Sequence, residues 1–166
     1  MSSRPKNIRP LKRYITTHDV SGKAIFSSAL SEEMPVTTIP DGADFSLAYT
    51  SSHFPAKLND EADIHEYAKY LSKPPGLVIR TGSVCRIVDM HPGATSPMHR
   101  TVSLDYGVVL EGEVELVLDS GETRLLKRGD TEWARMLYVL IPAEEIEIGG
   151  KKLGEELGHM GVRPSA

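Results

Sequence analysis

The chain has few cysteines, few aromatic residues and no excess of positive charge, and each of these features excludes a class of protein. The single cysteine, Cys85, excludes a disulfide within the chain. The 19 Lys and Arg are outnumbered by 23 Asp and Glu, and only 6% of residues are aromatic, so the basic, aromatic-rich surface typical of nucleic-acid binding is missing. No apolar run is long enough to span a bilayer. We therefore expect a cytoplasmic protein with neither a nucleic-acid nor a membrane partner.

The length and composition are those of one folded domain. Hydrophobic residues make up 40% and charged residues 25% of the chain, which are ordinary values for a globular protein. A chain of 166 residues leaves little room for a second domain. The first eighteen residues contain five basic side chains and no acid, which indicates a solvated arm. We expect an arm over residues 1–12 and a single domain over residues 13–166.

Hydrophobic periodicity predicts one helix among many short strands. Apolar residues recur at helical spacing over residues 60–71, where Asn59 or Asp60 is expected to cap the start and residues 74–76 (Pro-Pro-Gly) to end the helix. Polar turns are expected at residues 111–112 and 119–121. The expected strands cover residues 13–16, 23–28, 45–50, 77–80, 83–90, 104–110, 113–118, 123–126 and 133–141. Short strands at regular spacing favour an all-β sandwich or barrel.

A histidine and an aspartate in residues 93–112 are spaced so that they can share a site. Side chains alternate along a strand, so an extended chain from residue 99 onward would carry one polar row of His99, Thr101, Ser103 and Asp105. An imidazole and a carboxylate on one face can share a divalent metal. The alternative is that this row is the solvent-facing side of an antiparallel strand.

The same stretch resembles the first cupin motif, which runs glycine, five residues, His-x-His, three or four residues, Glu, six residues and glycine. Gly93, His99 and Gly112 fall at the motif's positions, while Thr101 stands at its second His and Asp105 at its Glu. Residues 8–160 are similar to small fungal single-domain cupins that accompany polyketide biosynthetic enzymes. The matching blocks are residues 13–19, 58–76, 85–90, 92–121, 131–135 and 154–158. The resemblance implies an all-β, cupin-like jelly-roll barrel with one short helix.

The second cupin motif has no counterpart in the chain. It runs glycine, five residues, Pro-x-Gly, two residues, His, three residues and Asn, and it should begin near Gly129. Counting from there, the Pro, Gly, His and Asn positions are occupied by Arg135, Leu137, Leu140 and Glu144. The likeness resumes at Thr131, so we expect a block of about fifteen residues, roughly a strand and a turn, to be missing between Asp130 and Thr131.

The resemblance implies a tailoring enzyme of oxidoreductase or dehydratase type that acts on a polyketide-derived small molecule. In longer relatives, iron, zinc, nickel or manganese would be held by residues at the positions of His99 and Asp105 together with the missing His. His99 and Asp105 are therefore the candidate metal ligands and catalytic residues of this chain. Two ligands are too few for a closed site, so metal binding is expected to be weak or absent in this form. The alternative is a non-catalytic cupin that binds a small molecule without turnover.

Two further expectations follow from the strand around Asp105. Thr101 and Ser103 share its predicted face, and Arg86 lies on the preceding strand, so these three are the candidate substrate-binding residues. For Arg86 the alternative is an ordinary exposed strand charge. The opposite side of residues 102–108 is apolar and must be covered if the polar side lines a barrel. A second copy of the chain would cover it, and we expect a homodimer.

Overall fold

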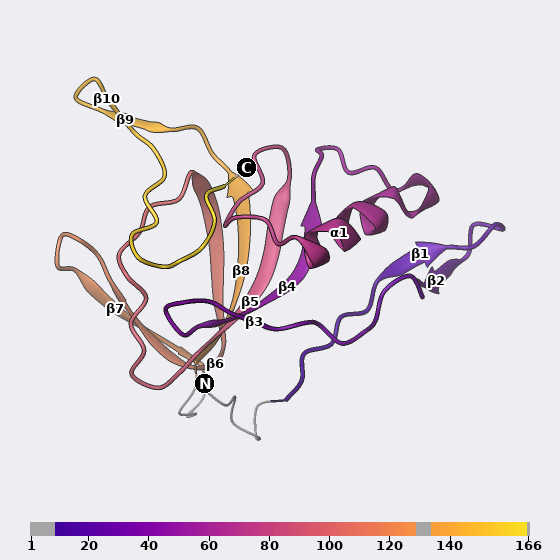
Figure 1. Ribbon diagram of the computed structural model, residues 1–166, viewed down its shortest axis with the longest axis horizontal. Coiled ribbons are helices and arrows are strands. Elements are labelled where there is room, and N and C mark those ends of the chain that lie inside the picture. Colours follow the sequence, from indigo (N-terminus) through magenta and orange to yellow (C-terminus); the bar gives the residue numbers. More distant parts are fainter. Residues whose placement is uncertain (1–8, 129–133, 166) are drawn as a thin grey trace.

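The computed structural model describes residues 9–128 and 134–165, and these form antiparallel β structure with one α-helix (Figure 1). The main strands are β3 (Thr37–Thr38), β4 (Asp44–Ser51), β5 (Ser83–Met90), β6 (Ser103–Val117), β7 (Thr123–Arg128) and β8 (Ala134–Pro142). They form one sheet in the order β3-β4-β5-β8-β6-β7. Two hairpins stand apart from this sheet and project from it: β1 (Thr16–His18) with β2 (Ala24–Phe26), and β9 (Ile146–Ile148) with β10 (Lys151–Leu153).

The strand register assigns each side chain to one of the two faces of the sheet. Arg86 on β5 pairs with Tyr138 on β8, which pairs in turn with Gly107 on β6. Residues that pair directly share a face, and every second residue along a strand returns to it. This face holds the buried cluster of Leu77, Val78, Ile79, Val84, Leu140 and Met160. We call it the inner face, and the opposite one the outer face.

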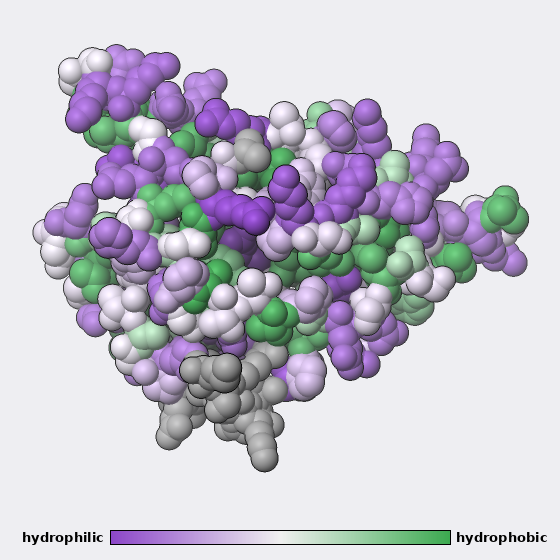
Figure 2. Space-filling model, viewed as in Figure 1, coloured by the Kyte–Doolittle hydropathy of each residue, from purple (hydrophilic) through white to green (hydrophobic). Residues whose placement is uncertain are grey.

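The C-terminal segment, residues 154–165, covers part of the inner face. Met160 is buried beside Val84 and Leu140, and the segment passes in front of the sheet in Figure 1. The same view of the surface shows apolar side chains interspersed across the middle of this side, whereas the β9–β10 hairpin is largely hydrophilic (Figure 2). Within the described residues the strands do not close into a barrel, because β3 and β7 are free edges of the sheet.

The helix packs against the outer side of β4. It spans Ala62–Ser72 (α1) and follows a 3₁₀ turn over Asn59–Glu61 (η1). The buried Tyr67 donates a hydrogen bond to the carbonyl of Leu47 at 2.6 Å, and its ring lies 4.6 Å from that of Tyr49. The predicted helix is confirmed, but the expected cap is wrong. Glu61 occupies the N-cap position with φ 54° and makes no side-chain cap hydrogen bond.

The structure corrects three strand predictions. Residues 77–79 are a buried loop, because the carbonyls of Gly76 and Leu77 bond a side chain, Arg86, in place of a neighbouring strand. The turn expected at residues 111–112 is absent from β6, which continues through Gly112 at φ 76° after a register shift beyond Val109. The strand expected over residues 13–16 begins only at Thr16. Trp133 and the junction between Asp130 and Thr131 lie outside the described residues.

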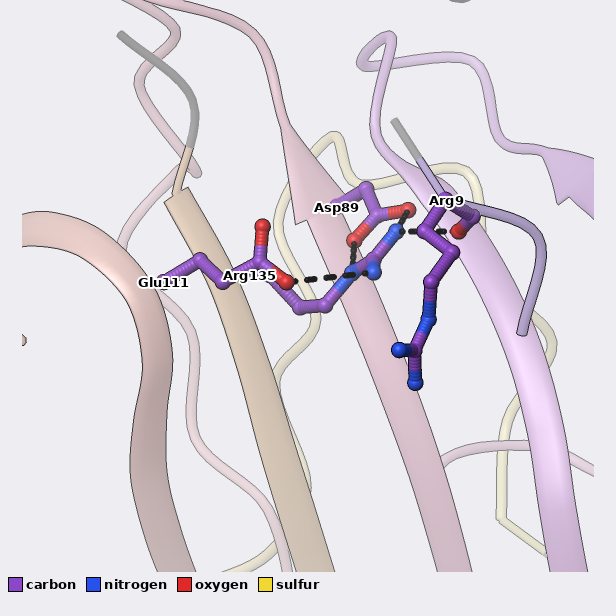
Figure 3. A network of polar contacts seen from close by, with 4 residues as sticks. All are labelled: Arg9, Asp89, Glu111 and Arg135. Atoms are coloured by element: carbon purple, nitrogen blue, oxygen red, sulfur yellow. Dashed lines mark hydrogen bonds and ion pairs between the residues drawn. The ribbon is translucent and has the colours of Figure 1, made fainter. Parts of the chain in front are cut away.

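A buried ion pair joins β5 to β8 at one end of the sheet (Figure 3). The guanidinium of Arg135 bonds both carboxylate oxygens of Asp89, with Nε–Oδ1 at 2.5 Å and Nη2–Oδ2 at 2.8 Å. Its Nη1 lies 3.5 Å from Glu111 on β6, and Nη2 donates to the carbonyl of Arg9 at 3.5 Å. The hydrogen bonds to Asp89 raise the pKa of Arg135 further above its ordinary value. This network therefore ties three strands and the N-terminal segment together.

Asp89→Asn should destabilise the fold strongly, because it leaves the charge of Arg135 buried without its carboxylate. We expect the free energy of unfolding to fall by about 3–5 kcal/mol in urea denaturation. Glu111→Gln is the matched control, since that carboxylate is half exposed. It should cost about 1 kcal/mol or less. Equal effects of the two substitutions would contradict a dominant role for the buried pair.

The outer side of β6 is apolar and open to solvent. Leu104 and Tyr106 are each 57% exposed and Val108 is 47% exposed, although they lie in the middle of the sheet. Exposed apolar side chains in a row are typical of a surface that another protein covers.

No helix within residues 9–128 and 134–165 is long and apolar enough to cross a membrane.

We expect two copies of the chain to associate through this outer side of β6. The double substitution Leu104→Glu and Val108→Glu should convert the dimer to a monomer, because it places charges in the apolar contact. Light scattering measures the mass, and circular dichroism checks that the variant keeps its strands. A wild-type chain that is monomeric at micromolar concentration would contradict the expectation.

Candidate functional site

Asp105 lies on the inner face of β6, the face that also carries Tyr138 of β8 and Arg86 of β5. It pairs with the buried Leu140 on β8, and its Oδ1 accepts a hydrogen bond from the Ser103 hydroxyl at 2.5 Å. Asp105 itself is exposed because no strand of the described residues covers this part of the inner face. The structure therefore brings together two of the predicted residues, Ser103 and Asp105, on the face that the cupin resemblance implies.

Arg86 is a buried cation on the same face. It is only 5% exposed, so the alternative of an ordinary surface charge is wrong. One terminal nitrogen donates to the carbonyl of Gly76 at 2.8 Å, and the guanidinium lies 4.9 Å from the ring centre of Phe45. Its Nε has no hydrogen-bond partner among the described residues. Burial lowers the pKa of Arg86 to about 10, and the charge of Asp105 offsets only part of that effect.

Tyr138 stands between Arg86 and β6 and was not singled out by the sequence. Its hydroxyl donates only to the sulfur of Met136, at 3.2 Å, which is a weak acceptor. Burial, and then the charge of Asp105, raises the pKa of Tyr138, so the phenol stays protonated. A Cβ on Gly107 would lie 3.3 Å from Cε1 of the Tyr138 ring. The glycine therefore leaves room for that ring to lie close against β6.

His99 and Thr101 precede β6, so the row expected to start at His99 starts only at Ser103. The backbone of residues 97–101 is bonded instead to the C-terminal segment, through the pairing of Arg100 with Glu156. His99 is exposed, and its Nδ1 lies 2.8 Å from the carbonyl oxygen of Pro97. Since a carbonyl only accepts, Nδ1 carries the proton, which leaves Nε2 as the nitrogen with a lone pair in the neutral ring. That tautomer is suited to metal binding through Nε2.

The donor set of the described residues does not fit a closed metal site. No group of three or more His, Cys, Asp or Glu side chains among them is arranged to hold an ion. His99 and Asp105 would supply one imidazole and one carboxylate, whereas catalytic zinc sites ordinarily use three protein ligands. The chemistry that this arrangement offers by itself is hydrogen bonding and proton transfer at Asp105, beside a buried positive charge.

Comparison with known proteins places these residues in a family. The chain is 45% identical over 167 positions to "Phomopsin biosynthesis cluster protein D" of Diaporthe leptostromiformis, covering 91% of this chain and 88% of that protein. It is 40% identical to "Oryzines biosynthesis cluster protein J" of Aspergillus oryzae, covering 96% and 99% of the two chains. A cupin-domain-containing oxidoreductase of Aspergillus ruber is 38% identical, with 88% and 79% covered.

Two other comparisons complete this result. No family model matches the chain. A candidate ethanolamine utilization protein Q of Salmonella typhimurium is 16% identical, with a TM-score of 0.42, covering 82% of this chain and 99% of that one. The relatives of 38–45% identity span nearly the whole chain, including both β5 and β6. The chain therefore belongs to the fungal cupin-domain family that includes these biosynthesis-cluster proteins and cupin-domain-containing oxidoreductases.

Proposed function

We propose that this family member is a tailoring protein for a polyketide-derived small molecule, of oxidoreductase or dehydratase type. Relatives of 38–45% identity are cupin-domain-containing oxidoreductases and biosynthesis-cluster proteins, which supports the general role. The observation that carries the proposal to particular residues is the inner-face group of Asp105, Ser103 and Arg86. Both reaction types require a group that takes or gives a proton beside the reacting carbon, and the Asp105 carboxylate is placed to do so.

The substrate-binding roles follow from the charges and hydrogen bonds of that group. Arg86 supplies positive charge toward a carbonyl or enolate oxygen, and the Ser103 hydroxyl holds the carboxylate of Asp105 at its Oδ1. Thr101 is half-buried just before β6 and is assigned to the rim of the same site. His99, exposed in that segment, is assigned to the rim as the imidazole donor of an incomplete metal set.

Alignment lengths support the interpretation that a block is missing from this form. The alignment with the Diaporthe protein spans 167 positions and covers 91% of this chain, which is about 151 of its 166 residues. At the remaining positions, about 16, the relative has a residue and this chain has a gap. The alignment with the Aspergillus oryzae protein spans 177 positions and covers 96%, about 159 residues, which leaves about 18.

The strand register indicates where the block would lie. β7 pairs with residues 112–117 of β6 and β8 with residues 103–111, so the end of β7 and the start of β8 meet near Gly112. In the proposal, a further strand and turn inserted between them supplies the missing His.

We propose a bound metal only for longer relatives that contain the missing block. There a third ligand from the missing block would complete a site with residues at the positions of His99 and Asp105, and iron, zinc, nickel or manganese would then polarise a substrate oxygen. For this 166-residue form the two-ligand donor set favours the second candidate function, a cupin that binds a small molecule without turnover.

The 166-residue chain, purified without added metal, should contain far less than one metal ion per chain, because two ligands leave most coordination positions to water. Inserting a relative's block between Asp130 and Thr131 should raise metal content toward one per chain and raise the melting temperature. Elemental analysis and thermal denaturation measure the two effects. An equally long Gly-Ser insertion at the same point is the control. Near-stoichiometric metal in the short form would contradict the two-ligand assignment.

A further inference from the structure

We propose that Arg86, Tyr138 and Asp105 form one binding site on the inner face for a small β-hydroxy acid or its β-hydroxy carbonyl equivalent. The three side chains come from three adjacent strands, β5, β8 and β6, and the register places all of them on one face. The proposal deepens the proposed function, because it rests on the inner face being the small-molecule site and names the chemical class that this site takes.

The buried guanidinium of Arg86 indicates an acidic group on the ligand. Its guanidinium is 5% exposed, and no ion pair joins it to an acid within the described parts of the chain. Its Nε is a buried donor without a partner there, which costs free energy in the unliganded protein. A carboxylate or carbonyl oxygen would accept that hydrogen bond and offset the buried charge. Arginine matches a planar carboxylate better than any other side chain.

Tyr138 supplies a second donor for the same oxygen atoms. Tyr138 pairs directly with Arg86 across the sheet, and the hydrogen bond that its hydroxyl makes within the described residues is to the Met136 sulfur. A carbonyl or carboxylate oxygen is a much better acceptor than a thioether. Gly107, directly opposite on the other side, gives the ring space to lean over β6. Donation to a ligand oxygen would replace the weak contact with the Met136 sulfur, and the charge of Asp105 acts on the same phenol.

The free acceptor capacity of Asp105 indicates a hydroxyl group on the ligand. It is exposed, and its carboxylate accepts one short hydrogen bond, from Ser103, which leaves further acceptor capacity. It acts on Arg86 through space, yet no ion pair or hydrogen bond between the two is found in residues 9–128 and 134–165. One strand, β8, separates them, and Arg86 lies opposite Gly107, two residues from Asp105, so their backbones are about 12 Å apart. A ligand with an acidic end and a donor hydroxyl two carbons away would bridge them across Tyr138.

The test measures binding of three matched probes to the 166-residue chain by ligand-observed NMR. The probes are 3-hydroxybutyrate, butyrate without the hydroxyl, and butane-1,3-diol without the carboxylate. We expect 3-hydroxybutyrate to bind most tightly. Tyr138→Phe should weaken that binding about tenfold, the loss of one hydrogen bond. Tyr106→Phe makes the same change on the outer face and should leave binding unaltered.

Two further variants separate ligand contact from a structural role. Asp105→Leu should bind 3-hydroxybutyrate no better than butyrate, because only the hydroxyl contact is removed. Gly107→Ala should weaken binding as Tyr138→Phe does, since its Cβ pushes the Tyr138 ring away. If the wild-type chain does not prefer 3-hydroxybutyrate to both other probes, or if Tyr138→Phe and Tyr106→Phe behave alike, the proposal is wrong.

Arg86→Met provides an independent measurement on the unliganded protein. A cation whose pKa is lowered by burial destabilises the fold at neutral pH, because the unfolded chain binds its proton more tightly. We therefore expect Arg86→Met to abolish binding of 3-hydroxybutyrate while the urea midpoint stays the same or rises. A large drop in the midpoint would assign Arg86 to structure and overturn its role as a ligand contact.

The outcomes also distinguish this site from the proposed function. If the probes bind as expected but a chain with the restored block shows no turnover, the catalytic proposal fails and the binding site stands. If a restored chain turns over substrate and Tyr138→Phe leaves its KM and kcat unchanged, the binding site fails and the catalytic proposal stands.

Discussion

Strand β8 holds this molecule together, because it is hydrogen-bonded to β5 on one side and to β6 on the other. That double pairing places Arg86, Tyr138 and Asp105 on one face of the sheet. A slip of one residue would turn Tyr138 to the outer face and bring Arg135 inward. The buried pair of Arg135 and Asp89 opposes such a slip at one end of the strand, because the slip would break their two charged hydrogen bonds. Burial of Leu140 against Val84 opposes it at the other end.

The two buried arginines show opposite solutions to the same electrostatic problem. The carboxylate of Asp89 bonds the guanidinium of Arg135 directly and balances its charge, so this buried pair stabilises the sheet. Arg86 has two carbonyls and an aromatic ring for neighbours but no carboxylate within bonding distance among the described residues. A protein that needed only a stable core would place an apolar side chain there. The proposed ligand on the inner face would supply the negative charge that the fold does not provide.

Patterns in the sequence predict the parts of the fold in which one face is consistently apolar. The helix and strands β4, β5 and β8 were all expected near their observed positions, and so was the shared face of Ser103 and Asp105. Residues 77–79 were expected as a strand because a buried loop and a buried strand are equally apolar. The continuity of β6 was missed because a glycine between two strands usually indicates a turn, whereas Gly112 bends one strand.

Tyr138 and Arg86 were harder to assign because their roles depend on partners far away in the sequence. Tyr138 stands in an apolar run and looks like core, and only its pairing with Gly107 shows that its ring lies over β6. The sequence offered one signal, a glycine in the middle of an otherwise bulky strand, which marks a close approach. His99 was expected in the same row as Asp105, but the pairing of its neighbour Arg100 with Glu156 starts the strand later.

The C-terminal segment has a consequence for the order in which the protein can form during synthesis. The amide of Val78 donates to the hydroxyl of Ser165, 87 residues away, and Met160 completes the cluster around Val84 and Leu140. Contacts of such long range close large loops and form slowly. While the ribosome is still making residues 157–165, the loop over residues 77–79 lacks its cover and the inner face is exposed. Nascent chains that lack residues 157–165 therefore carry an apolar surface, and chaperones have that interval in which to bind it.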